Sequence, residues 1–370
     1  MQIGSGITIG SNITIGDLPT VPYLSSSLYS FTTMTFTTAG NVGRYGPTLA
    51  NCVSAYSGNS WVSNTSFFNM TTQGFQRWTV PATGTYSITA AGSRAGRATG
   101  QLYTSGNGAI VSGTVSLVQG QILEIICGQY LDATAGLASV TTYAGLGGGG
   151  GTFVNNATTS ALLFAAGGGG GAGTYSSNTP TGYAGGNGQT TTFGGNGAVT
   201  GSNVGGTNGN GGTIYTTVGS SYRGGAGAGW LSNGQNGDAT TPPATPAATT
   251  YGFGGLSYAS GFIGGNYGTS WGNPSSYAST YGGFGGGGGG NGIIDGGGGG
   301  GYSGGGISGA SGSTYESGTG GGGSFIITTA TSVSTSDGNY NLSSTFNSNP
   351  ITNLNSFNQG SGYVTITRIS

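Results

Sequence analysis

The sequence predicts an all-β protein in which a β-sandwich carries a large glycine-rich insertion. Short runs rich in β-branched and aromatic residues are separated by Gly, Pro and Asn at intervals of roughly eight to twelve residues, which is typical of a sandwich. In addition, 65 of the 87 glycines lie between residues 145 and 325 of the 370-residue chain. No helical periodicity competes with these patterns.

The first sixteen residues contain a near-repeat, Ile3–Thr8 followed by Ile9–Thr14, that alternates apolar and small polar residues. This alternation indicates extended β structure. Two repeats cannot cover their own apolar faces, so their isoleucines must dock on another protein or on the chain's own sandwich. We expect residues 1–24 to attach the chain to a partner through Ile3, Ile7, Ile9, Ile13 and Ile15.

Residues 25–145 are expected to form the first part of the sandwich, and residues 325–370 its closing strands. Each predicted strand is a short run bounded by turn-forming residues. The predicted strands are Tyr29–Thr38, Gln76–Val80, Gly84–Ile88, Ala109–Val118, Gln121–Ile126 and Gly360–Arg368. Because the last run follows the insertion, we expect the C-terminal strand to close the sandwich.

Residues 146–324 form the insertion, for which the sequence allows two states. Disorder is the default for glycine-rich chains, because ordering costs about 1 to 2 kcal/mol per residue and glycine loses the most freedom. The alternative is a bundle of polyglycine-II helices with three residues per turn, hydrogen-bonded backbone to backbone. The tracts are short, and apolar strands such as Leu162–Ala166 and Ser324–Ile327 abut them. These features favour a bundle, with aromatic loops, that is anchored to the sandwich.

Composition excludes most catalytic chemistry, because the chain has neither His nor Lys. The usual general base is missing, as are the lysines of P-loops and Schiff bases. The seven carboxylates are scattered singly, so an acid–base pair could assemble only through the fold. They are Asp17, Glu124, Asp132, Asp238, Asp295, Glu316 and Asp337. We therefore expect a non-enzymatic protein without a cofactor or a metal site.

Charge and hydropathy bear on the partners. The net charge is −1 and the six arginines are dispersed, so we expect no nucleic-acid binding. The start lacks the features of a signal peptide, and no run of 18 apolar residues predicts a membrane span. Cys52 and Cys127 are 75 positions apart in the sequence. This spacing favours two buried thiols over a disulfide.

Aromatic residues and one arginine in the glycine-rich region are the candidates for receptor binding. Tyr, Trp and Arg are enriched at binding hot spots, and aromatic faces also stack on sugars. The alternative is that these rings cap the bundle, because glycine helices have no apolar side chains of their own to bury. The candidates are Tyr222, Arg223, Trp230, Tyr251, Tyr258, Tyr267, Trp271, Tyr277 and Tyr302.

A series of segments also occurs in a distinctive order along residues 31–368. The series comprises Phe36–Gly40, Gly46–Thr48, Asn51–Tyr56, Gly74–Tyr86, Gly113–Gln129, Gly147–Val154, Ala165–Gly171 and Gly362–Ile366. In this order the segments resemble the glycine-rich ectodomain family of anaplastic lymphoma kinase and leukocyte tyrosine kinase. The resemblance implies a jelly-roll, tumour-necrosis-factor-like sandwich and a region that binds protein ligands. Ala39 replaces a family cysteine that could pair with the one matching Cys52, which implies a free thiol at Cys52.

The glycine-rich module is also similar to proteins of giant viruses and of phages of marine cyanobacteria, and the repeat over residues 3–16 resembles the N-terminal segments of cyanophage virion proteins. This resemblance implies a structural protein on the outer surface of a virion. As a tail fibre or adhesin it would bind a host glycan or an outer-membrane protein, and we expect a homo-oligomer such as a trimer. A head-fibre or capsid decoration protein is the alternative, and a protein-ligand-binding ectodomain module is a third possibility.

Overall fold

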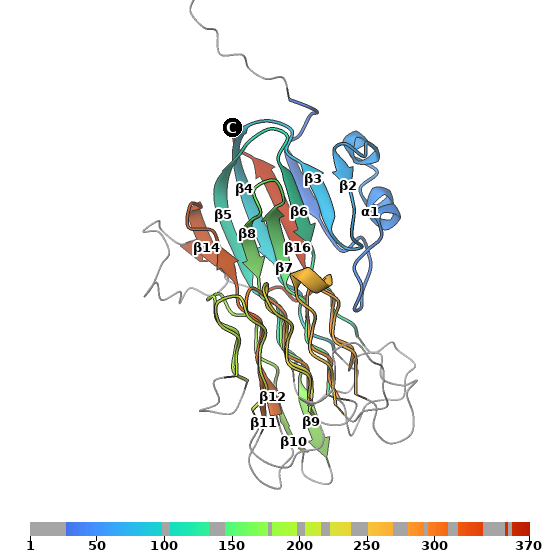
Figure 1. The fold of residues 1–370 in the computed structure, drawn as a ribbon, viewed down its shortest axis with the longest axis vertical. Helices are drawn as coiled ribbons and strands as arrows, with labels where there is room; N and C mark the ends of the chain where they lie inside the picture. Colours follow the sequence, from blue (N-terminus) through green and yellow to red (C-terminus); the bar gives the residue numbers. More distant parts are fainter. Residues whose placement is uncertain are drawn as a thin grey trace, which may run out of the picture.

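A computed structural model of the chain shows a mostly β protein (Figure 1). It describes residues 27–97, 104–132, 145–176, 180–197, 204–215, 223–237, 251–268, 280–291, 295–309, 317–335, 352–353 and 357–370. The predicted attachment isoleucines, from Ile3 to Ile15, lie outside these residues. Two sheets form a sandwich, and the glycine-rich tracts run side by side away from one end of it.

The first sheet has the order β1-β16-β4-β5-β14-β15, with antiparallel pairing except between β14 and β15. Its strands are β1 (Thr33–Phe36), β16 (Tyr363–Arg368), β4 (Gly84–Ala91), β5 (Ile110–Leu117), β14 (Thr331–Thr335) and β15 (Thr352–Asn353). The C-terminal strand β16 lies between β1 and β4 and pairs with both of them.

The second sheet has the order β13-β8-β7-β6-β3-β2 and is antiparallel throughout. Its strands are β13 (Phe325–Ile326), β8 (Ala161–Ala166), β7 (Thr152–Asn156), β6 (Ile122–Ile126), β3 (Gln76–Thr79) and β2 (Phe68–Asn69). Two short hairpins lie within the glycine-rich region. They are β9 (Gly173–Ser176) with β10 (Pro180–Tyr183), and β11 (Ile307–Gly309) with β12 (Ser317–Thr319).

The main hydrophobic core fills the space between the two sheets. Alternation places Tyr86, Ile88 and Ala90 of β4 inward, where all three are fully buried. From the facing sheet, Trp78 of β3 and Phe164 of β8 complete the centre of the core. Burial of an aromatic side chain of this size stabilises the fold by about 2 to 3 kcal/mol, so these alternating strands account for the sandwich.

One helix contradicts the prediction that no helical stretch interrupts the strands. α1 (Leu49–Ala55) is seven residues long and begins at a capping box, in which Thr48 and Asn51 satisfy each other's backbone N–H groups. A box with Asn in place of Glu or Gln, before only two turns, gives no periodic sequence signal. Two 3-10 turns, η1 (Ser60–Ser63) and η2 (Tyr258–Ser260), are the other helical elements among the described residues.

Hydrogen bonds in the glycine-rich region connect different tracts. Gly168 and Gly171 donate to the carbonyls of Gly300 and Gly297, each at 2.8 Å. Between them, Gly170 donates in another direction, to Gly186. Two residues that are three positions apart thus donate hydrogen bonds to the same antiparallel tract, and a residue between them donates to a different tract. Gly148 and Gly151 repeat the pattern toward Gly288 and Gly285. Backbone hydrogen bonds therefore hold the tracts together. We call this part of the molecule the glycine layer, and its tracts include residues 147–151, 167–171, 285–290, 296–301 and 320–323.

Close packing in the glycine layer requires the absence of side chains. A β-carbon built on Gly148 would lie 2.1 Å from the carbonyl oxygen of Gly298, and one built on Gly287 would lie 2.2 Å from that of Gly148. Real β-carbons do not approach backbone atoms this closely, because the overlap is strongly repulsive. Only glycine can make these close contacts. They favour an ordered glycine layer over the disorder that is the default for such a composition.

A second hydrophobic cluster joins the glycine layer to the outer face of the second sheet. Phe153 of β7 stacks on Phe262 with ring centroids 4.2 Å apart, and both rings are fully buried. Phe262 adopts a left-handed φ of 52°, and its carbonyl accepts hydrogen bonds from Gly285 and Gly286. One residue therefore packs on the sandwich through its ring and on the glycine layer through its backbone.

Candidate functional site

A pocket of about 430 Å³ lies where a loop of the sandwich, residues 41–46, meets the glycine layer. We call it the Arg44 pocket. Its lining comes from four separate parts of the chain and includes the side chains of Asn41, Arg44, Tyr45, Gln73, Leu131 and Tyr281. A volume of this size is within the range of pockets that hold small ligands.

Backbone hydrogen bonds fix loop 41–46 in place. The N–H of Gly43 donates to Tyr130 at 2.9 Å, and its carbonyl accepts from Phe284 at 2.8 Å. The carbonyl of Arg44 accepts from Gly264 at 2.9 Å. Gly43 has a φ of 113°, which L side chains rarely adopt. The loop is therefore bound to the sandwich on one side and to glycine tracts on the other.

Arg44 lies between two tyrosine rings. Its guanidinium carbon is 5.3 Å from the ring centroid of Tyr45 and 5.7 Å from that of Tyr281, within cation–π range. Its Nε donates to the carbonyl of Gly264 at 3.0 Å. Within the described part of the chain, neither Nη atom has a hydrogen-bond partner. The guanidinium thus keeps donors available to a ligand.

Partial burial sets the electrostatics of the pocket. It lowers the pKa of Arg44, and the phenol groups of Tyr45 and Tyr281 oppose that shift. An arginine nevertheless stays charged at physiological pH. The positive charge is therefore partly desolvated, which strengthens its attraction to an anion that enters the pocket.

The rest of the lining is uncharged and rich in hydrogen-bond acceptors. Asn41 donates through Nδ2 to the carbonyl of Thr38 at 3.1 Å, and Gln73 donates through Nε2 to Gly46 at 2.7 Å. Among the described residues, no donor reaches the side-chain oxygen of either amide. Tyr45 is 55% exposed and so presents a free aromatic surface. The pocket combines one cation, two amide oxygens and aromatic rings.

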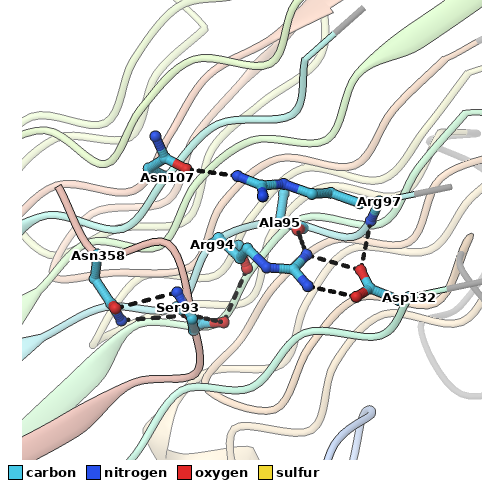
Figure 2. A network of polar contacts seen from close by, with 8 residues as sticks. Ser93, Arg94, Ala95, Arg97, Asn107, Asp132 and Asn358 are labelled. Atoms are coloured by element: carbon cyan, nitrogen blue, oxygen red, sulfur yellow. Dashed lines mark hydrogen bonds and ion pairs between the residues drawn. The ribbon is translucent and has the colours of Figure 1, made fainter. Parts of the chain in front are cut away.

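Leu131 lines the pocket, and its neighbour Asp132 belongs to a polar network with Arg94 and Arg97 (Figure 2). The buried Arg94 donates to both carboxylate oxygens of Asp132, and its guanidinium carbon lies 3.6 Å from the ring centroid of Tyr130. Asp132 also accepts from the backbone N–H of Arg97 at 2.8 Å. Both neighbours of Leu131 are thereby held against residues 94–97, which follow β4.

Three of the predicted receptor-binding residues lie in the second hydrophobic cluster. Trp230 stacks on Tyr258 with centroids 4.2 Å apart, and Tyr302 stacks on Phe325 of β13 at 4.8 Å. The hydroxyl of Tyr258 donates to the buried Glu124 at 2.7 Å. Burial first, and then this hydrogen bond, raises the pKa of Tyr258 to about 12. These rings pack between the sandwich and the glycine layer, as expected if the aromatic residues cover the glycine tracts. Their role in receptor binding stays a prediction.

The remaining predicted residues are spread over the glycine layer. Arg223 and Tyr251 lie on neighbouring tracts, since the N–H of Gly252 donates to the carbonyl of Arg223. Tyr267 makes an edge contact with Tyr281, with ring centroids 4.7 Å apart, and so borders the Arg44 pocket. The predicted residues Tyr222, Trp271 and Tyr277 lie outside the described residues.

Sequence reasoning missed Arg44, Tyr45 and Tyr281. Tyr222 and Arg223 were predicted because they lie in the glycine-rich region and because Tyr and Arg are enriched at binding hot spots. Arg44 and Tyr45 are of the same residue types but lie within residues 25–145, which were predicted to form the sandwich, and so they were not selected. Tyr281 reaches the pocket only through the fold, so no local pattern identifies it.

Several titratable groups elsewhere in the described part of the chain have structural partners. Glu124 forms an ion pair with Arg77, with 3.7 Å between Oε1 and Nε. Cys52 and Cys127 are free and buried, as their spacing predicts. Burial raises the pKa of Cys52 to about 12 and also raises that of Cys127, so both thiols are protonated at neutral pH. In the ranges listed above, no cluster of three potential ligands could hold a metal ion, and no helix is long and apolar enough to span a membrane.

The chain shows partial sequence similarity to a known receptor. The leukocyte tyrosine kinase receptor of Mus musculus is 36% identical over 94 residues, which is 25% of this chain. The match covers 10% of the receptor, so the chain corresponds to a small part of that protein. No family model matches the chain. The similarity agrees with part of the resemblance described above and reaches no further than those 94 residues.

Proposed function

We propose that the chain is a non-enzymatic recognition protein that presents a rigid surface to a partner. The observation that carries the proposal is the way loop 41–46 is fixed between the sandwich and the glycine layer. Rigid scaffolds with functional loops are a common arrangement for binding, because little conformational entropy is lost when the partner docks. The similarity to a protein named as a receptor supports recognition over catalysis.

The proposal includes a finer architecture, a jelly-roll sandwich that carries a bundle of polyglycine-II helices. The three-residue period of the hydrogen bonds, as from Gly168 and Gly171 to one neighbour, supports such helices because polyproline-II-like chains have three residues per turn. The two six-stranded sheets, with β16 returning between β1 and β4, support a sandwich of jelly-roll type.

The biological setting we propose is the external surface of a phage virion. Residues 1–24 would attach the chain to other virion proteins, and the rest would act as a tail fibre or adhesin that binds a host glycan or an outer-membrane protein. The assembly we propose is a homo-oligomer, such as a trimer. The resemblance of residues 3–16 to cyanophage virion proteins supports this setting. Decoration of the head is the alternative location.

A second candidate function is a protein-ligand-binding module. The 36% identity to the leukocyte tyrosine kinase receptor over 94 residues favours it. The two candidates differ in their partner, which is a host surface for the adhesin and a soluble protein ligand for the module.

Deletion of residues 1–16 from the gene of the intact phage tests the proposal. We expect the particles to lack the protein, because the docking isoleucines are gone, while the truncated chain stays folded. Replacement of Ile7 and Ile13 by valine is the matched control and should preserve incorporation. Mass spectrometry of purified particles measures the protein, and adsorption assays measure attachment to cells. Truncated protein found in particles would contradict the anchor role. Normal adsorption of particles that lack the protein would contradict the adhesin and favour head decoration.

A further inference from the structure

We propose that the Arg44 pocket binds the carboxylate-bearing ring of an acidic saccharide, such as a uronic acid residue. This inference rests on the proposed recognition function and names its ligand class. The guanidinium of Arg44 would pair with the carboxylate, and the aromatic and amide groups around it would contact the sugar ring. No covalent step is involved.

The charge distribution favours an anionic ligand. Within the described ranges, the two ion pairs join Arg77 to Glu124 and Arg94 to Asp132, and neither includes Arg44. None of the described residues that line the pocket is acidic. A planar guanidinium with two available Nη groups matches the two oxygens of a carboxylate, and such charge-assisted pairs are the strongest hydrogen bonds that a pocket of this kind can offer.

The uncharged lining favours a ring that carries hydroxyl groups. The side-chain oxygens of Asn41 and Gln73 can accept hydrogen bonds, and sugar hydroxyls are suitable donors. Tyr45 presents an exposed ring, on which the apolar C–H face of a sugar can stack. A carboxylate on a protein partner would use Arg44 but would supply few donors to the two amides. The observations therefore favour a saccharide over a peptide.

The position of the guanidinium is largely set before binding. The contact with Gly264 and the two neighbouring tyrosine rings restrict Arg44, and the Arg94 network holds the residues on either side of Leu131. A preorganised cation loses little entropy when a ligand binds. We therefore expect selectivity for acidic over neutral sugars even where the affinity for a single ring is low.

The test is a titration of the isotopically labelled full-length chain, followed by NMR, with D-glucuronate, D-glucose and N-acetylaspartate amide as probes. We expect glucuronate to bind at least about tenfold more tightly than either other probe, a ratio that corresponds to 1.4 kcal/mol. Arg44→Gln should remove this preference. Arg368→Gln is the matched control, because Arg368 also donates through Nε to a backbone carbonyl, that of Ser370 at 3.2 Å. This variant should bind like the native chain.

Several results would overturn the inference. Equal affinity for glucuronate and glucose would remove the role of the charge, and unchanged binding by a folded Arg44→Gln variant would remove this pocket. Should Arg44→Gln fail to fold, Tyr45→Ala replaces it, and an unaltered glucuronate affinity would then count against the site. Tighter binding of N-acetylaspartate amide would point to a protein carboxylate. If no probe binds but phage adsorption still depends on the protein, the ligand class is wrong and the recognition function stands. Loss of both would reject the two together.

Discussion

Replacing Gly148 by valine should lower the free energy of unfolding by about 3 kcal/mol, the upper end of the usual cost of overpacking. A β-carbon at this position would overlap the carbonyl oxygen of Gly298 at 2.1 Å, and backbone cannot move aside as a flexible side chain would. The N–H of Gly148 also bonds to Gly288, so any shift would strain a second tract. Gly287→Val should act similarly, since its β-carbon would meet Gly148.

Chemical denaturation of the variants measures this effect. Gly58→Val is the matched control, because a β-carbon at Gly58 has no atom within 4 Å. Substitutions at such surface positions change stability by about 0.5 kcal/mol or less. Equal stability of the Gly148 and Gly58 variants would mean that the tracts do not pack against each other in solution.

Replacing Phe262 by alanine should be as damaging, with a loss of about 3 to 5 kcal/mol of stability. The ring is fully buried against Phe153, and its removal leaves a cavity at the junction of sandwich and glycine layer. The left-handed φ of 52° is itself unfavourable for a residue with a side chain, by about 1 to 2 kcal/mol. Without the ring, the backbone of residue 262 is less firmly held. Its carbonyl, which accepts hydrogen bonds from Gly285 and Gly286, would then be less well positioned.

Phe193→Ala is the control for this variant, because Phe193 also belongs to the glycine-rich region but is 54% exposed. Thermal unfolding followed by circular dichroism compares the two. A midpoint for Phe262→Ala that matches the Phe193→Ala midpoint would show that the junction does not stabilise the glycine layer.

The sandwich strands were predictable because their residues alternate between two environments. Tyr86 and Ile88 of β4 point inward while Ser87 and Thr89 are partly exposed, and this pattern is visible in the sequence. β14 was not predicted, since its register against β5 shifts between Thr331 and Ser334 and breaks the alternation. α1 was missed for a related reason, because two turns are too short for a helical period.

The candidate site was less predictable than the fold. Aromatic composition led to Tyr267, which borders the Arg44 pocket, but also to Trp230 and Tyr258, which pack at the junction. Composition identifies rings but not the surfaces they contact. Arg44 and Tyr281 are 237 positions apart in the sequence and meet only because both segments are held by the glycine layer. Glycine tracts have no side-chain pattern, so their neighbours cannot be read from the sequence.

Amide hydrogen exchange across residues 145–171, 280–291 and 295–301 tests most directly whether the glycine tracts form a solid layer. The structure predicts protection comparable to that of β4 and β5 in the sandwich, because the N–H groups of residues such as Gly149, Gly168 and Gly288 are bonded to carbonyls of other tracts. Exchange at the rate of an unstructured peptide in these tracts, with β4 and β5 still protected, would contradict the account.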